Sequence, residues 1–235
     1  MEYGGAATGA RANNDQELTG AGVTRRATLG AASVAAYLIA VALVELLRRA
    51  EVVSVGDLAA TPDAIADLKL WVLATSAFIV SGPPVLELLG VAIAAALLVR
   101  RRSAGTFWAC AVTGHVAGTL IVYGSVGVLW LASHETVRSV LDRPDYGVSA
   151  VWLAVLGALL VCAIDAVRAG RASSIDRLLI VACPLAALIG FAFFPLLSGS
   201  EHLVAFLAGM LVARIYPVWR GGSVPPGVGG RLFDP

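Results

Sequence analysis

Two polar side chains stand at the starts of long apolar runs and have the chemistry of a hydrolytic pair. Ser149 follows the turn-forming residues Pro144, Asp145 and Gly147, and His202 opens the last apolar run of the chain. A serine hydroxyl is a poor nucleophile near neutral pH, unless a base such as a neutral imidazole takes its proton. The two residues could therefore act as nucleophile and general base. Ser149 taken alone is more typical of a helix N-cap, because serine beside Asp and Gly is ordinary capping chemistry.

The residues around this pair fit such a site. Gly147 permits a tight turn of the backbone into a helix. The N–H groups of the first turn of that helix, at Val148 and Ser149, would favour a developing oxyanion. Ala205 and Gly209, four residues apart after His202, would let their helix approach a neighbour closely.

A second histidine lies within an apolar run. His115, Thr119 and Tyr123 are spaced four residues apart and so share one face of a helix. A histidine inside a membrane is costly unless it faces protein or water, so His115 is a candidate for supporting an oxyanion, or is satisfied by a neighbouring helix. Glu87 has the same two interpretations: it pairs with a buried donor such as His115, or it stays neutral near the outer surface.

The composition indicates the elements that must position these residues. Of 235 residues, 58% are hydrophobic and 14% are charged, and the mean hydropathy is +0.83. Long apolar runs with few charges predict an all-α membrane protein, since a β-barrel would alternate. A net charge of +1 gives no reason to expect a nucleic acid partner. The three cysteines lack metal-ligand spacing and are predicted to be packing residues, and we expect neither a metal nor another cofactor.

The apolar runs divide the chain into three parts. Residues 1–23 are predicted to be a disordered cytoplasmic tail, 24–217 a six-helix membrane domain, and 218–235 a flexible cytoplasmic tail. Residues 70–82 are too short to cross a core of about 30 Å and should lie in the interface or dip partway. The six predicted spans are 24–47, 84–100, 105–131, 149–167, 177–196 and 202–217.

The distribution of basic residues predicts the orientation. With the N-terminus inside, twelve of the seventeen basic residues fall in cytoplasmic segments, as the positive-inside rule requires. Both termini are then cytoplasmic, and Ser149 and His202 begin their spans on the same external side. One lysine against sixteen arginines, with abundant alanine and glycine, favours a GC-rich bacterial genome and hence a bacterial plasma membrane. The twelve basic residues predicted to be cytoplasmic are Arg11, Arg25, Arg26, Arg100, Arg101, Arg102, Arg168, Arg171, Arg177, Arg214, Arg220 and Arg231.

Over residues 28–217 the chain resembles the rhomboid family of intramembrane serine proteases. The sequence 147-GVSA-150 matches that family's Gly-x-Ser-x motif at the start of the fourth helix. The sequence 202-HLVAFLAG-209 matches its sixth-helix histidine and the small-xxx-Gly pattern that follows, and 75-TSAFIVSG-82 looks like its membrane-embedded first loop. The resemblance implies a six-helix core, a Ser149–His202 dyad and a transmembrane protein substrate, without a cofactor.

The chain departs from the family's pattern at several positions. The second-helix His-xxx-Asn that binds the oxyanion corresponds to Val85 and Leu89, which cannot donate a hydrogen bond. Leu153, beside Trp152, replaces the tyrosine that packs on the catalytic histidine, and Ala205 replaces the first glycine of the last-helix pattern. The family's Trp-Arg pair is also missing from the first loop. These departures leave open whether the chain is an enzyme.

Three functions remain open from the sequence. The first is a rhomboid-like intramembrane serine protease, and the second is an inactive rhomboid-like pseudoprotease that binds client transmembrane helices. A small transporter or membrane anchor is less favoured, because no line of charges crosses the bilayer. The sequence does not indicate an oligomeric state. Four further residues have simple expectations: His134 as a solvated loop residue, Ser198 and Ser200 as loop or cap residues, and Asp165 as an ion-pair partner of Arg168, one turn away.

Overall fold

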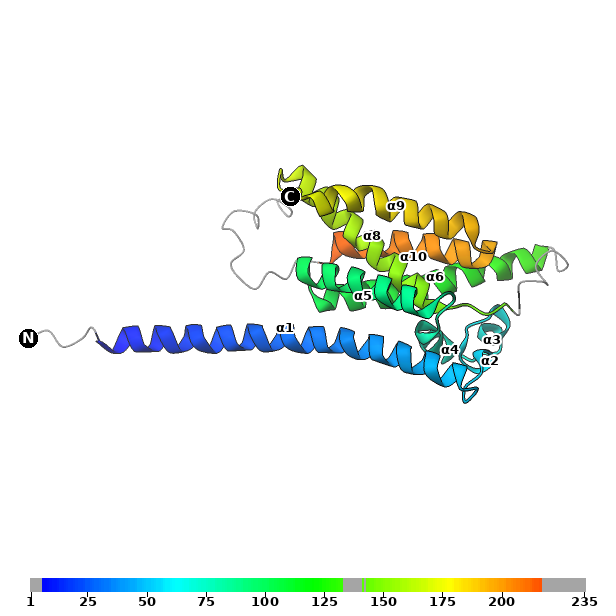
Figure 1. The fold of residues 1–235 in the computed structure, drawn as a ribbon, viewed down its shortest axis with the longest axis horizontal. Coiled ribbons are helices and arrows are strands. Elements are labelled where there is room, and N and C mark those ends of the chain that lie inside the picture. Colours follow the sequence, from blue (N-terminus) through cyan, green and yellow to red (C-terminus); the bar gives the residue numbers. More distant parts are fainter. Residues whose placement is uncertain (1–5, 133–140, 142, 217–235) are drawn as a thin grey trace, which may run out of the picture.

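The computed structural model describes residues 6–132, 141 and 143–216, with side chains from residue 28 onward. Every regular element in these residues is a helix, and their one extended pairing is an isolated bridge between Ala60 and Asp145. The predicted all-helical fold class is therefore confirmed. The elements (Figure 1) are α1 (Ala6–Arg49), α2 (Val55–Leu58), α3 (Pro62–Ala66), α4 (Val72–Thr75), the 3₁₀ turn η1 (Ser76–Phe78), α5 (Pro84–Arg101), α6 (Ala104–Ala132), α8 (Gly147–Arg168), α9 (Ser174–Phe193) and α10 (Leu196–Ile215).

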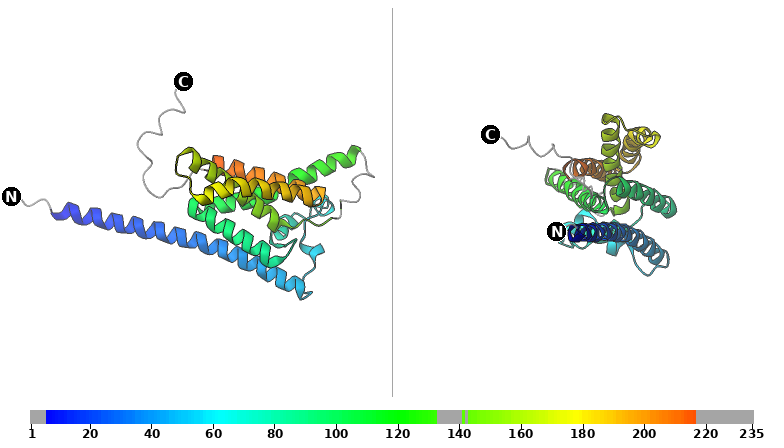
Figure 2. Two further views of the ribbon diagram at one scale, coloured as in Figure 1. Left: turned by 45° about the horizontal axis from the view of Figure 1, so that its top comes forward. Right: turned by 90° about the vertical axis from the view of Figure 1, so that its left-hand side faces the viewer.

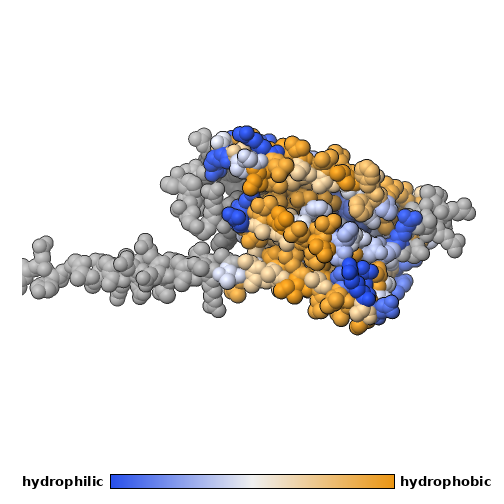
Figure 3. All heavy atoms as spheres, viewed as in Figure 1, coloured by the Kyte–Doolittle hydropathy of each residue, from blue (hydrophilic) through white to orange (hydrophobic). Residues whose placement is uncertain are grey.

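Five helices are long and apolar enough to cross a membrane. They are α1 from Thr28 onward, α6, α8, α9 and α10, each of 20 to 29 residues. Apolar side chains cover the middle of the bundle, and hydrophilic residues gather toward its two ends (Figure 3). This distribution is what a bilayer core with two polar interfaces requires. The chain is therefore a multi-pass membrane protein.

Helix α5 occupies the position of the second predicted span. Its 18 residues match the predicted bounds 84–100 closely, but they include Glu87 near one end and Arg100 and Arg101 at the other. With three charged residues in 18, α5 is not among the five helices that are long and apolar enough to cross a membrane. Helix formation at this position was predicted correctly, whereas its crossing of the membrane stays a prediction.

Helix α8 lies at the centre of the bundle. It packs against α5, α6, α9 and α10 (Figures 1 and 2). In its most apolar stretch of 18 residues, 89% are buried, against 22–50% in the corresponding stretches of the other four candidate spans. Its valine, leucine and alanine side chains make up much of the core, and the other helices turn one face outward. The residues at the start of α8 are therefore held by contacts on several sides. The cysteines Cys110, Cys162 and Cys183 are buried and free, in agreement with a packing role.

Helices α8 and α10 approach each other with almost no space between their backbones. A Cβ atom at Gly209 would overlap the backbone carbonyl of Ala154, and one at Gly157 would overlap that of Phe206. Ala205 is fully buried and packs near Gly118 of α6. The predicted close approach at Ala205 and Gly209 is confirmed.

Residues 70–82 do not form a long helix, as predicted. They fold into α4, η1 and an extended stretch, and Val72, Ser76, Ile79 and Val80 are buried against the bundle. The Val148 N–H donates a hydrogen bond of 3.3 Å to the Ile79 carbonyl, which ties this segment to the start of α8. The segment thus lies directly beside the predicted dyad.

The N-terminal tail differs from its prediction. Residues 6–23, expected to be disordered, continue α1 without a break to Arg49, and the helix extends past the rest of the bundle (Figure 1). The stretch has no proline, and its alanine, glutamine, glutamate and arginine residues are good helix formers. Low hydrophobicity indicated disorder, but local helix propensity prevails. The C-terminal tail, 218–235, and His134 lie outside the described residues.

The predicted ion pair between Asp165 and Arg168 is wrong. Asp165 instead contacts Arg102 at 3.3 Å and Arg214 at 3.0 Å. Both arginines come from the ends of other helices, so cross-helix contacts replace the local pair. Nearby, Arg101 pairs with Asp176, which also completes a capping box with Ser173. The ends of α5, α8, α9 and α10 are joined here.

Candidate active site

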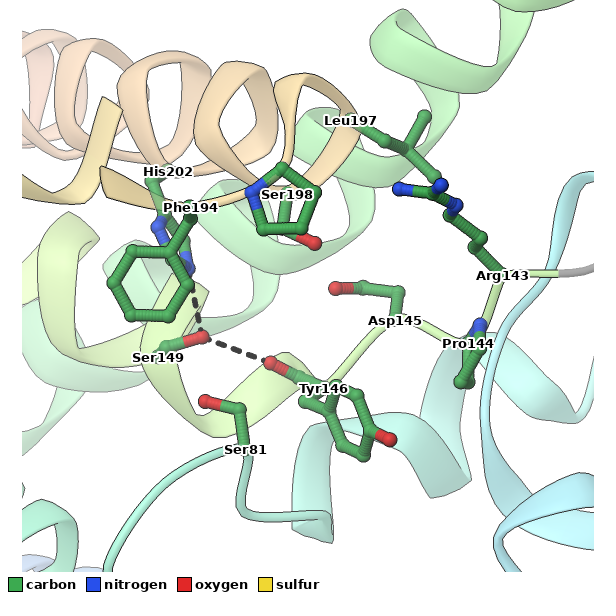
Figure 4. A pocket seen from close by; sticks show the side chains of 11 residues that line it. Ser81, Arg143, Pro144, Asp145, Tyr146, Ser149, Phe194, Leu197, Ser198 and His202 are labelled. Carbon is green, nitrogen blue, oxygen red and sulfur yellow. Dashed lines mark hydrogen bonds between the residues drawn. The ribbon is translucent and has the colours of Figure 1, made fainter. Parts of the chain in front are cut away.

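Ser149 and His202 meet at the opposite end of α8. The Ser149 Oγ lies 2.8 Å from the His202 Nε2, as drawn in Figure 4. Ser149 is the third residue of α8, and His202 lies in the second turn of α10; their side chains are 8% and 4% exposed. The close packing of α8 on α10 brings together two residues that are 53 positions apart. This distance is that of a nucleophile and its base.

The hydrogen bond of His202 Nδ1 determines whether Nε2 is protonated. His202 Nδ1 lies 3.3 Å from the backbone carbonyl of Gly190, and a carbonyl can only accept a hydrogen bond. The neutral ring therefore has its proton on Nδ1, and the lone pair of Nε2 faces the Ser149 hydroxyl. This tautomer is the one that a general base needs.

Helix α9 supplies the group that orients the imidazole. The Gly190 carbonyl belongs to the last turn of α9, where carbonyls have no partner within the helix. Phe194, which caps the same helix, packs edge-on against the His202 ring with centroids 5.0 Å apart. Neither residue was predicted from the sequence. The pair Phe194-Pro195 could have indicated them, because it ends the apolar run of α9 shortly before His202 and so brings the end of that helix near the histidine.

Ser149 is not the N-cap of its helix. The N-cap is Tyr146, whose side chain makes no capping hydrogen bond. The Ser149 hydroxyl has two acceptors within reach, namely the His202 Nε2 at 2.8 Å and the Tyr146 carbonyl at 2.9 Å (Figure 4). It has one proton to give, so it can donate to only one of these acceptors at a time.

Of the two backbone N–H groups predicted to favour an oxyanion, one is occupied. The Val148 N–H is already bound to the Ile79 carbonyl, so in this conformation it cannot serve an oxyanion. The Ser149 N–H has no acceptor among the described residues, and it belongs to the first turn of α8, where the helix dipole favours negative charge. Val85 and Leu89 are 76% and 54% exposed and lie outside the pocket. Helix α5 thus contributes no donor at these positions.

His115 has a structural position and does not reach the pocket. Its Nε2 lies 2.9 Å from the Leu73 carbonyl and 3.0 Å from the Ser76 Oγ, and the carbonyl requires the proton on Nε2. A Cβ at Gly147 would overlap the His115 ring, so the space around this ring is what requires a glycine at position 147. The predicted oxyanion role of His115 is not what this geometry supports. The face of α6 that holds His115 is buried, since Thr119 and Tyr123 on the same face are 1% and 5% exposed.

Glu87 does not pair with His115. Its carboxylate accepts hydrogen bonds from the Ser81 hydroxyl at 2.8 Å, the Gly82 N–H at 2.6 Å and the Ser81 N–H at 3.4 Å. The carboxylate thereby fixes the turn before α5, and Ser81 on that turn lines the pocket. The position of Glu87 in the first turn of α5 also suits its negative charge.

The dyad lies in a cavity of about 280 Å³. Its walls come from the segment before α8, the α9–α10 junction and the turn before α5 (Figure 4). Ser198, predicted to be a loop or cap residue, lies in the first turn of α10 and lines this cavity, while Ser200 does not. The other lining residues are Ser81, Arg143, Pro144, Asp145, Tyr146, Phe194, Pro195 and Leu197.

Comparison with family models, with curated proteins and with solved structures finds no match for this chain. The interpretation of the site therefore depends on its geometry.

Proposed function

We propose that this protein is a rhomboid-like intramembrane serine protease that cleaves transmembrane protein substrates. The observation that supports it most strongly is the 2.8 Å contact between Ser149 Oγ and His202 Nε2, with Nδ1 directed at the Gly190 carbonyl. A capping or packing serine needs no imidazole in the tautomer of a base. The apolar bundle around the pair fits a substrate that is itself embedded in lipid.

The reaction follows from the groups at the site. Ser149 Oγ attacks a peptide carbonyl carbon while its proton passes to His202 Nε2, and the Ser149 N–H donates to the new oxyanion. The imidazolium then gives this proton to the leaving amine, and water hydrolyses the acyl-enzyme by the same route. While charged, the ring keeps its Nδ1–H on the Gly190 carbonyl. The C-terminus of α9 has partial negative charge and so stabilises the imidazolium, as a third catalytic group would.

A pseudoprotease of the same architecture is the second candidate. The exposure of Val85 and Leu89 favours it, because these positions leave the oxyanion fewer donors. Loss of one such donor lowers kcat by about 10²- to 10³-fold. A slow protease and an inactive helix-binding protein therefore have to be separated by reactivity at Ser149.

Labelling with a fluorophosphonate separates the two candidates. The purified protein in detergent is expected to react, while Ser149→Ala and His202→Ala abolish the reaction. Ser198→Ala is the matched control, since Ser198 lines the same cavity while the hydrogen bonds of His202 go to Ser149 and Gly190. Equal labelling of wild type and Ser149→Ala, or no labelling at all, would favour the pseudoprotease.

We also propose a bacterial plasma membrane location with cytoplasmic termini and the dyad toward the exterior. Three arginines lie toward the dyad, since Arg143 lines its cavity and Arg48 and Arg49 end α1. Support comes from the four arginines in the last turns of α5, α8 and α10, which lie at the end far from the dyad. The positive-inside rule makes that end cytoplasmic. A reporter fused after Pro235 that is active only in the cytoplasm tests this orientation.

A further inference from the structure

Two buried carboxyl groups lie beside the dyad, and the reaction does not use them. Asp145 is 3% exposed and Glu201 is 1% exposed, and their carboxyl groups are within hydrogen-bonding reach of each other. Asp145 lies four residues before Ser149, and Glu201 directly precedes His202. The contact between them therefore joins the two elements that hold the nucleophile and the base.

The surroundings give this pair few donors. The Thr119 hydroxyl donates to Asp145 Oδ2 over 3.5 Å, a long contact, and neither oxygen of Glu201 accepts a hydrogen bond from any described residue. The nearby Tyr123 hydroxyl donates elsewhere, to the Ala60 carbonyl at 3.1 Å. The titratable groups that face the pair are His115 and Tyr123 from α6 and His202 from α10. Arg143, from the segment before α8, lines the adjoining cavity.

A single proton removes both the repulsion between the two carboxylates and the lack of a hydrogen-bond donor to Glu201. Two adjacent carboxylates away from water repel each other strongly, so one of them takes up a proton. The protonated group then donates a short, charge-assisted hydrogen bond to the other, which supplies the donor that Glu201 lacks. A buried acidic pair becomes an attractive link once it holds one proton.

The backbone around each acid is also fixed. The Asp145 N–H donates to the Ala60 carbonyl at 2.8 Å, and the Glu201 carbonyl lies against α6, where a Cβ at Gly118 would be only 3.4 Å away. The two carboxyl groups therefore close a junction between the start of α8, α6 and α10.

We propose that Asp145 and Glu201 share one proton and act as a positioning pair, which holds the start of α8 against α10 so that Ser149 meets His202. The shared proton is a property of the fold, whereas its effect on Ser149 reactivity rests on the proposed function. Neither residue touches the reacting atoms in this role.

Infrared spectroscopy tests the shared proton without reference to activity. Wild type at neutral pH should show the carbonyl stretch of a buried carboxylic acid. Glu201→Gln should remove it, because a glutamine N–H donates to an ionised Asp145. Asp165→Asn, which makes the same chemical change at a half-exposed ion pair, should keep the band. Absence of the band in wild type, or its persistence in Glu201→Gln, would overturn the proposal.

Fluorophosphonate labelling tests the positioning role. Glu201→Gln keeps a donor and should label within about threefold of wild type. Glu201→Leu leaves Asp145 ionised and without that donor, and misplacement of the dyad should slow labelling by about 10- to 100-fold. Labelling of Glu201→Leu at the wild-type rate would overturn the positioning role.

Should Glu201→Leu fail to fold, the pH dependence of labelling decides. Alkaline pH should slow labelling of wild type but not of Glu201→Gln, and parallel pH profiles of the two proteins would refute the pair. If wild type does not label at all, the proposed function fails and the infrared result still decides the shared proton.

Discussion

The orientation of His202 by the end of α9 leads to a prediction with a defined magnitude. A Cβ added at Gly190 would lie 3.3 Å from His202 Nδ1, 3.4 Å from Leu153 Cδ1 and 3.6 Å from His202 Cβ. The first of these is tighter than an ordinary contact, so the ring must move by a few tenths of an ångström. A misplacement of about 1 Å costs about 10²-fold in rate, so Gly190→Ala should slow fluorophosphonate labelling by about 3- to 10-fold. By transition-state arithmetic this corresponds to about 0.7–1.4 kcal/mol.

The matched control is Gly124→Ala on α6, because a Cβ at Gly124 would have no atom within 4 Å. Both changes replace a helical glycine by alanine and should raise helix stability by up to about 1 kcal/mol, apart from local contacts. The assay is the second-order rate constant of labelling in detergent, measured beside thermal unfolding of each variant. Labelling of Gly190→Ala at the rate of Gly124→Ala would refute the view that contact with Gly190 sets the position of the base.

Three further predictions concern the scaffold. Gly209→Ala should lower the free energy of unfolding by about 1–3 kcal/mol, because its Cβ would overlap the Ala154 carbonyl. Gly127→Ala is the control, since a Cβ there would stand in open space and should not lower this free energy. Equal stability of the two variants in denaturant titrations would contradict the prediction. Glu87→Ala should cost about 1–3 kcal/mol by removing the acceptor of Ser81 and Gly82, and Glu87→Gln should cost less because it keeps one acceptor oxygen, which thermal unfolding in detergent can rank. Asp165→Asn should change stability by less than about 1 kcal/mol, since the Asp165 side chain is 40% exposed, and a larger loss would mean that the ion pairs are shielded from solvent.

The sequence was sufficient to predict the long helices after α1 and the two residues, Ser149 and His202, that meet between α8 and α10. Long apolar runs defined α6, α8, α9 and α10, because a bilayer requires about 20 apolar residues from each crossing helix. The positive-inside rule then put the starts of two runs on one side, and Ser149 and His202 were the polar residues there. The small residues Ala205 and Gly209 indicated the close helix contact that joins them.

The groups that adjust the dyad were not predictable in the same way. The Gly190 carbonyl orients His202 from a third helix, and no side-chain pattern identifies a backbone oxygen. The contact between Asp145 and Glu201 depends on how α8 and α10 pack, and Asp145 looked like an ordinary turn residue. Asp165 was assigned a partner on its own helix because local spacing is all that a sequence displays, while its arginine partners come from other helices.

The most direct test of the central claim is to locate a covalent adduct. After reaction of the wild-type protein with a fluorophosphonate, mass spectrometry of its peptides should find one modified residue, Ser149, and His202→Ala should remove the modification. An adduct on Ser198, which lines the same cavity, or an unmodified Ser149 in folded protein would contradict the assignment of Ser149 and His202 as nucleophile and base.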